Sequence, residues 1–174
     1  MTAEDLLQLP SDQRCELIDG VLIEMSPTTP QHGIVEVTVC GIIDGFVRPR
    51  RLGRVMAGEV GFIIRRDPDA VRAPDVAFVR RERLPDLPRT GFGEVPPDLV
   101  VEIVSPGDTP AEIQAKVRDW VEAGVPLQWW LYPETQAVRV VRSLQDREEL
   151  GPGDTLNGGD VLPGFSCLVS ALFQ

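Results

Sequence analysis

The chain has almost no lysine. Among the 17 basic residues of its 174 there is one lysine, Lys116, and the others are arginines. It also has no apolar run near the ~20 residues that a membrane-spanning helix needs, and its first five residues include two acids and no base where a secretory signal would be basic. We therefore expect a cytoplasmic protein. Its lone lysine needs an explanation, because an ammonium and a guanidinium group are not interchangeable.

Cysteine is scarce as well. The three cysteines, Cys15, Cys40 and Cys167, are far apart and form no CxxC pair. This spacing excludes both a disulfide framework and a zinc site, so we expect reduced thiols in the core. The apolar fraction of 43% and charged fraction of 25% are typical of a soluble globular protein. The length favours a single domain over residues 1–174.

Charge is unevenly distributed along the chain. The net charge of −10 argues against a general nucleic-acid coat protein. Residues 48–89, however, contain 11 arginines and 6 acids, a local balance of +5. A segment of this kind can contact a phosphate backbone, or it can be a set of solvated loops. The sequence leaves both interpretations open.

Periodicity and turn signals predict an α/β (α+β) fold, with a mixed β-sheet flanked by helices. An Asp19-Gly20 pair between two apolar runs over 15–25 adds an N-terminal β-hairpin, since a type I′ turn needs positive φ at both central residues. Residues 31–48 also alternate in part like a strand, but their length favours a helix. The predicted helices cover residues 2–9, 31–48 and 110–124, and the other predicted strands cover 58–65, 74–79, 99–104, 128–132 and 137–142.

Three smaller expectations concern the connections. Gly41 and Gly45, spaced as in a GxxxG motif, indicate close packing of their helix against a neighbouring element. The sequence Asp67-Pro68-Asp69 predicts a turn between the strands at 58–65 and 74–79. Residues 84–97, rich in proline and glycine, are typical of a mobile loop.

Lys116 lies on the apolar stripe of the predicted helix 110–124. A threonine cap, a proline and a glutamate at 109–112 mark the start of that helix. The other residues of the stripe are Ile113, Val117, Trp120 and Val121. Just upstream, Glu102 interrupts the apolar strand 99–104. A buried ammonium near a buried carboxylate is either a structural ion pair or half of an active site.

Asp75, Glu102 and Lys116 are expected to converge. Two carboxylates on adjacent strands offer the hard oxygen ligands that Mg²⁺ or Mn²⁺ prefers, an arrangement common in catalysis on phosphates. A nearby ammonium can orient the attacking water or stabilise the phosphorus centre. Two other interpretations stay open: Asp75 can simply begin a strand, and Glu102 and Lys116 can form an ion pair without catalysis.

Several motifs resemble a known family of short prokaryotic proteins, once catalogued as a domain of unknown function and described as predicted restriction endonucleases, in the PD-(D/E)XK nuclease superfamily. Their order and spacing cover nearly the whole chain. The motifs are Cys15-Glu16-Leu17-Ile18-Asp19-Gly20, Met25-Ser26-Pro27 followed by His32, residues 74–79, residues 97–106, Lys116, Gly124-Val125 before Trp130, and Leu162-Pro163-Gly164-Phe165.

The resemblance implies a restriction-endonuclease-like core and a divalent-metal site. Asp75 stands at the aspartate of the PD motif, and Glu102 at the acidic residue of the (D/E)XK motif. Val104 replaces the lysine of that motif, and Lys116 on the next helix is the family's apparent substitute. Glu16 is a further candidate metal ligand or a solvated hairpin residue.

His32, the only histidine, is a candidate proton donor or phosphate contact, or a helix-start residue satisfied by local backbone. The leading hypothesis is a metal-dependent DNA endonuclease, in which Asp75 and Glu102 bind Mg²⁺ or Mn²⁺ and Lys116 positions the attacking water. The arginines of residues 48–89 would contact DNA, and the protein would act as a homodimer. The rival hypotheses are a non-catalytic nucleic-acid-binding or degenerate nuclease module and an enzyme that acts on RNA or a nucleotide.

Overall fold

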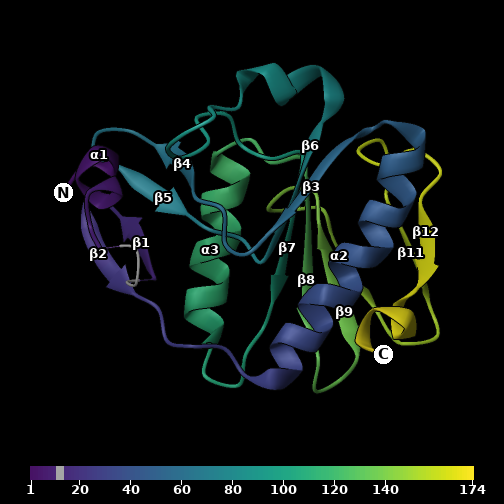
Figure 1. The fold of residues 1–174 in the computed structure, drawn as a ribbon. Coiled ribbons are helices and arrows are strands. Elements are labelled where there is room, and N and C mark those ends of the chain that lie inside the picture. Colours follow the sequence, from purple (N-terminus) through teal and green to yellow (C-terminus); the bar gives the residue numbers. More distant parts are fainter. Residues whose placement is uncertain (11–13) are drawn as a thin grey trace.

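The computed structural model describes residues 1–10 and 14–174. At its centre is a six-stranded sheet in the order β10-β9-β8-β7-β6-β3 (Figure 1). Strands β7 and β8 are parallel and the other neighbours are antiparallel, so the sheet is mixed as predicted. Its strands are β3 (Gly53–Ala57), β6 (Val76–Arg80), β7 (Leu99–Ile103), β8 (Leu127–Tyr132), β9 (Ala137–Val141) and β10 (Arg147–Leu150).

A second sheet, in the order β2-β1-β5-β4, lies beside the first. The predicted hairpin supplies two of its strands, with Asp19 at φ 52° and Gly20 at φ 75° in the turn. The strands are β1 (Cys15–Ile18), β2 (Val21–Glu24), β4 (Phe62–Arg65) and β5 (Ala70–Arg72). A third, two-stranded sheet pairs β11 (Thr155–Asn157) with β12 (Ser166–Leu168).

Three α-helices confirm the predicted ones: α1 (Ala3–Leu7), α2 (Pro30–Arg50) and α3 (Pro110–Glu122). The start of α3 is a capping box in which the Thr109 hydroxyl accepts from the Glu112 N–H and the Glu112 carboxylate accepts from the Thr109 N–H. Gly124, at φ 85°, follows its end. Two 3₁₀ helices, η1 (Arg81–Asp86) and η2 (Val169–Phe173), complete the elements.

The helices α2 and α3 cover opposite faces of the central sheet. Residues at odd positions of β7, such as Val101, belong to the core cluster that includes α2 and the C-terminal segment. Val100, on the alternate side, belongs to the cluster that includes Val117 and Trp120 of α3. Because side chains alternate along a strand, Glu102 is on the α3 face, where Lys116 also lies.

The structure corrects several predicted connections. The strand expected at 58–65 is β4 alone, because Gly58 (φ 84°) and Glu59 (φ 60°) adopt left-handed conformations that end the preceding β3. The Asp67-Pro68-Asp69 turn joins β4 to β5 and not to residues 74–79. Both β3 and β5 were missed, as were the short β10, β11 and β12, whose polar or brief sequences carry little periodicity.

Two other expectations also change. The predicted mobile loop at 84–97 begins inside η1, and Gly93 exchanges backbone hydrogen bonds with Gly61 and Ile63 at 2.9 and 2.8 Å. Gly41 and Gly45 are exposed, and a Cβ at either position would meet nothing within 4 Å, so the expectation of close packing was wrong. Among the described residues, no helix is long and apolar enough to cross a membrane.

The three cysteines are free and half-buried. Cys40 and Cys167 pack against the main core, and Cys15 packs against the small cluster that joins α1 to the second sheet. Burial raises the pKa of Cys167 to about 11. These contacts agree with the expectation of reduced core thiols.

Two glycine substitutions test the packing of the sheet and of α2. A Cβ at Gly53 would collide with the Val79 carbonyl oxygen and lie 2.7 Å from the Phe78 ring. We therefore expect Gly53→Ala to lower the free energy of unfolding by about 1–3 kcal/mol. Gly41→Ala, in open space within a helix, should raise it by about 0.5–1 kcal/mol. Urea unfolding of both variants gives the two values, and an unstable Gly41→Ala protein would contradict the exposed position of that residue.

Candidate active site

The predicted acidic residues come together from adjacent strands. Strands β6 and β7 are antiparallel neighbours, with Val76 opposite Val101. If this register is continued by one residue, Asp75, just before β6, stands opposite Glu102 of β7. Side chains of opposite residues on one face of a sheet are close neighbours. Both side chains are largely buried, at 12% and 6% exposure. Strands β6 and β7 thus place Asp75 and Glu102 on neighbouring segments of the sheet.

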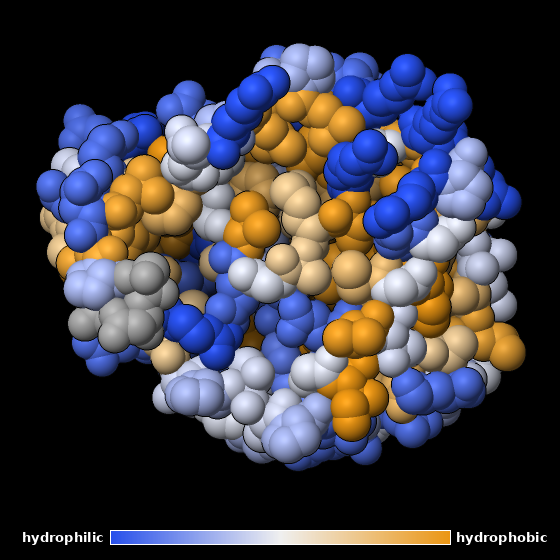
Figure 2. Space-filling model, viewed as in Figure 1, coloured by the Kyte–Doolittle hydropathy of each residue, from blue (hydrophilic) through white to orange (hydrophobic). Residues whose placement is uncertain are grey.

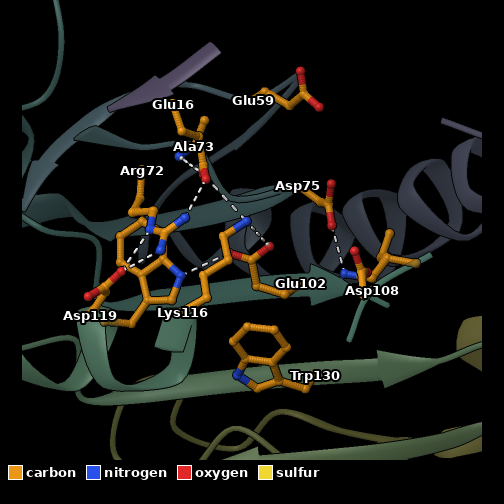
Figure 3. A network of polar contacts seen from close by, with 12 residues as sticks. Glu16, Glu59, Arg72, Ala73, Asp75, Glu102, Asp108, Lys116, Asp119 and Trp130 are labelled. Carbon is orange, nitrogen blue, oxygen red and sulfur yellow. Dashed lines mark hydrogen bonds and ion pairs between the residues drawn. The ribbon is translucent and has the colours of Figure 1, made fainter. Parts of the chain in front are cut away.

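Lys116 points from α3 directly at Glu102. Its Nζ lies 2.8 Å from Oε2 of Glu102 and 3.5 Å from Oε1 of Glu16, between the two carboxylates (Figure 3). The other oxygen of Glu102 accepts a hydrogen bond of 2.8 Å from the indole N–H of Trp120, one helical turn further along. Two residues of the apolar stripe of α3 therefore hold the Glu102 carboxylate.

Asp75 also has a partner for each oxygen. Its Oδ2 accepts a hydrogen bond of 2.6 Å from the N–H of Ile103, and its Oδ1 lies 3.3 Å from Nε2 of His32. The histidine reaches the carboxylate from the first turn of α2, on the opposite side of the sheet from α3. Asp75 thus does more than begin a strand, because it connects β7 to α2.

Glu16 belongs to an ion network that the sequence analysis did not foresee as a whole. Its Oε2 accepts from Nη1 of Arg72 at 2.6 Å, and its Oε1 accepts from the Ala73 N–H at 2.9 Å. Arg72 also donates through Nε to Asp119 at 2.9 Å (Figure 3). Glu16 is buried, so its interpretation as a solvated hairpin residue was wrong.

Arg72 and Asp119 were missed, although the sequence carried a signal for each. Arg72 interrupts the apolar run Ala70–Ala73, as Glu102 interrupts its own strand. Asp119 follows Lys116 by three residues and therefore shares its helix face. Through these two side chains, β5 of the second sheet is bonded to α3.

Burial dominates the electrostatics of the central pair. It raises the pKa of Glu102 to about 7, even though the ammonium of Lys116 acts to lower that pKa, because Asp75 and Glu16 add repulsion. Burial acts to lower the pKa of Lys116, but the charges of Glu102, Glu16 and Asp75 outweigh it and raise that pKa above its ordinary value. Lys116 therefore keeps its proton at neutral pH.

His32 is a buried, ionisable neighbour of this centre. Its hydrogen bond to Asp75 raises its pKa against the opposing effect of burial, and the charge of Glu36 raises it further. Its Nδ1 is buried and has no hydrogen-bond partner among the described residues. The alternative that His32 is a helix-start residue satisfied by local backbone accounts for its backbone N–H alone, which donates to the Thr29 hydroxyl at 3.3 Å. It does not account for the imidazole ring.

Val104 stands at the position where the (D/E)XK motif would place a lysine on the strand. It lies just past the end of β7, two residues beyond Glu102, and packs against the same core cluster as α3. A lysine there would approach the carboxylates along the strand, whereas Lys116 approaches them from the helix above the sheet. The ammonium thus reaches the acidic centre by a different route.

The donor set suits a divalent cation by its charge. The network contains the four carboxylates of Glu16, Asp75, Glu102 and Asp119, and the permanently charged cations Lys116 and Arg72. A cation would neutralise this excess of negative charge and would favour the ionised form of Glu102, whose pKa burial raises most and Asp75 and Glu16 raise further. Among the described residues no group of three or more acidic, histidine or cysteine side chains is arranged to hold a metal. Asp75 and Glu102 are enough for Mg²⁺, which commonly takes one or two carboxylates and completes its shell with water and substrate phosphate.

The arginines of residues 48–89 divide into two groups. Figure 2 shows strongly hydrophilic residues over the C-terminal end of α2, where Arg48, Arg50 and Arg51 are exposed. Six of the eleven arginines form ion pairs with carboxylates: Arg48, Arg65, Arg66, Arg72, Arg80 and Arg83. The other five are exposed and form no ion pair within the part of the chain that the structure describes: Arg50, Arg51, Arg54, Arg81 and Arg89. Of these, Arg50 donates to the Phe46 carbonyl and stacks over its ring.

Because His32 is the only histidine, NMR can measure its pKa without assignment. We expect a value above the ordinary ~6.5. The His32–Asp75 pair then contributes stability that is complete below about pH 6.5 and is lost as the pH rises through the raised value. Asp75→Asn should return the pKa towards 6.5, and Glu36→Gln, which removes a weaker influence, should lower it less. A wild-type value below 6.5 would refute the Asp75 contact.

Removing Arg72 should be costly, because it takes from the half-buried Asp119 its only ion-pair partner among the described residues and leaves the buried Glu16 with Lys116 alone as a cation. We expect Arg72→Ala to lower the free energy of unfolding by about 3–5 kcal/mol. Arg142→Ala, which breaks exposed pairs with Asp146 and Glu148, is the control and should cost less than about 1 kcal/mol. If both variants lose the same free energy of unfolding in urea, the Arg72 contacts stabilise the protein no more than an exposed ion pair does.

Comparisons with known proteins agree with this architecture. Residues 3–170 match the model of the Uma2 family, described as "Putative restriction endonuclease". The chain is also similar to a crystal structure described as a "putative nuclease belonging to DUF820" from Anabaena variabilis, with a TM-score of 0.83 and 22% identity over 99% of this chain and 97% of that one. The search of curated proteins found no match. Since the family model spans nearly the whole chain, the protein belongs to the Uma2 family of restriction-endonuclease-like proteins.

Proposed function

We propose that the protein is a metal-dependent endonuclease that hydrolyses DNA phosphodiester bonds at the centre formed by Asp75, Glu102 and Lys116. The observation that carries the proposal is the Lys116 ammonium 2.8 Å from Glu102, within a buried group of carboxylates that its own charge does not balance. Membership of the Uma2 family supports a nucleic-acid substrate.

Asp75 and Glu102 would hold Mg²⁺ or Mn²⁺, which when bound supplies charge neutralisation at the phosphate and a lower pKa for a water molecule. Each of their oxygens accepts one hydrogen bond, so each keeps a lone pair for a ligand. Glu16 is more heavily engaged, because its Oε2 accepts from Arg72 while its Oε1 accepts from Ala73 and also contacts Lys116. Glu16 remains a candidate third ligand, but its contacts favour a role in holding Lys116.

Lys116 acts in this proposal as a fixed positive charge. Because its pKa is raised, it cannot accept a proton at neutral pH and therefore does not serve as the general base. A protonated ammonium can donate hydrogen bonds to the attacking water and stabilise the negative charge that develops on the phosphoryl oxygens. Lys116 is carried by α3, and that helix is fixed by the capping box at its N-terminus and by the contact between Arg72 and Asp119.

His32 would supply a second positive charge next to Asp75. Its raised pKa keeps part of the imidazole protonated near neutral pH, so it can contact a phosphate or donate a proton to a leaving oxygen. The exposed arginines Arg51, Arg54, Arg81 and Arg89 are the candidates for contacts with the DNA backbone. Assembly as a homodimer, with one centre for each strand, and a cytoplasmic location stay predictions.

The rival function is a non-catalytic nucleic-acid-binding module. It is favoured by one observation, that Lys116 and Trp120 already engage both oxygens of Glu102, as they would in a structural ion pair. An enzyme of the same mechanism acting on RNA is the other alternative. Metal-dependent cleavage would exclude the non-catalytic module. Cleavage of DNA or of RNA would then decide between the proposed enzyme and the RNA-cleaving alternative.

The decisive experiment incubates supercoiled plasmid, single-stranded DNA and RNA with the protein in Mg²⁺, Mn²⁺ or chelator. We expect chelator-sensitive DNA cleavage that falls by about 100-fold or more in Lys116→Ala and in Glu102→Gln, the scale of losing one charge-stabilising donor. Arg118→Ala, which removes an exposed cation from the same helix, is the matched control and should cleave normally.

Circular dichroism of each variant must show a folded protein. If folded wild-type protein cuts no nucleic acid with either metal, the endonuclease proposal fails. If RNA alone is cut, the mechanism stands and the substrate changes.

A further inference from the structure

A cavity of about 150 Å³ opens beside the proposed active site. It lies between the first turn of α2, the segment 104–106 that follows β7 and the turn 133–134 that follows β8. Strands β7 and β8 are parallel, so the cavity is at their carboxyl ends, where parallel sheets commonly bind ligands.

His32 forms the wall between this cavity and the acidic centre. Its Nε2 lies 3.3 Å from Oδ1 of Asp75, and the same residue is part of the cavity lining. The side chain is only 6% exposed, and its Nδ1 has no hydrogen-bond partner among the described residues. A buried nitrogen without a partner is costly, so a ligand that supplies one would be favoured. A group bound in the cavity would therefore lie next to the scissile phosphate.

The lining selects against a phosphate and for an uncharged ring. No lysine or arginine lines the cavity, and Glu134, an exposed acid, lies on it. Val104, Pro106 and Pro133 supply apolar walls. An apolar cavity of about this volume engineered in another protein binds benzene, so one six-membered ring suits this volume better than a fused pair of rings.

We propose that this cavity binds the base of the nucleotide next to the cleaved bond, and that the preferred base is cytosine. The inference rests on the proposed nuclease function. Among single-ring bases, cytosine presents an amino group that can donate to the Glu134 carboxylate, whereas thymine and uracil present a carbonyl oxygen there. The base must leave its stack to enter, so single-stranded or frayed DNA is the favoured substrate.

A binding experiment tests the cavity without any cleavage. Cytidine, thymidine and adenosine are titrated at constant pH, without metal, and the NMR signal of the lone histidine is followed. We expect a saturable shift with cytidine and weaker or no shifts with the other two. Glu134→Ala should weaken cytidine binding by about tenfold, the scale of one hydrogen bond to a charged group. Glu122→Ala, an exposed acid on α3 that does not line the cavity, should bind as wild type does.

A second experiment follows sequence preference in cleavage. Single-stranded DNA of mixed sequence is cut by wild type and by Glu134→Ala, and the fragment ends are sequenced. Cytosine enrichment next to the cut in wild type, lost in Glu134→Ala while total cleavage continues, supports the proposal. The absence of any nucleoside-dependent shift, or an equal response to all three nucleosides, overturns it. If cytidine binds but no DNA is cut, the base site stands and the nuclease function fails.

Discussion

The contact between Lys116 and Glu102 is the interaction on which the rest of the centre depends. Each charge alone would be expensive so far from water, and each is held by further partners: Trp120 on one side, Glu16 on the other. The pair is nevertheless not neutral in its surroundings, because Asp75 and Glu16 bring additional negative charge. Arg72 and His32 contact these two acids, but Arg72 is shared with Asp119, so four carboxylates surround two side chains that are cationic at neutral pH. This surplus of carboxylates is the physical reason to expect a cation.

The second sheet explains how a lysine on a helix can replace a lysine on a strand. A strand lysine is positioned by its own backbone, whereas Lys116 depends on where α3 sits. Arg72 of β5 bonds to Asp119 of α3 and to Glu16 of β1, so the small sheet fixes both the helix and the carboxylate that holds the ammonium. The N-terminal hairpin therefore contributes to the proposed active centre.

The sequence predicted the parts of this structure that have strong local signals. The capping box before α3, the Asp19-Gly20 turn and the interruption of an apolar strand by Glu102 each stand out in a short window. Pairings between distant residues were not accessible in this way. Nothing local shows that Arg72 meets Asp119, 47 positions away, or that His32 reaches Asp75 across the end of the sheet. The short strands β3 and β5 were missed because tertiary pairing, more than local preference, forms them.

The central claim is that the acidic centre binds a divalent cation next to the Lys116 ammonium, which competes with that cation for an oxygen of Glu102. Direct measurement of Mn²⁺ binding by electron paramagnetic resonance, in wild type and in Lys116→Met, tests it most directly. Removing the ammonium takes away a competing positive charge and frees an oxygen of Glu102, so the account predicts that wild type binds Mn²⁺ and that Lys116→Met binds it more tightly. Asp75→Asn should bind it more weakly. Folded wild-type and Lys116→Met proteins that both fail to bind Mn²⁺ would contradict the account and leave Glu102–Lys116 as a structural ion pair.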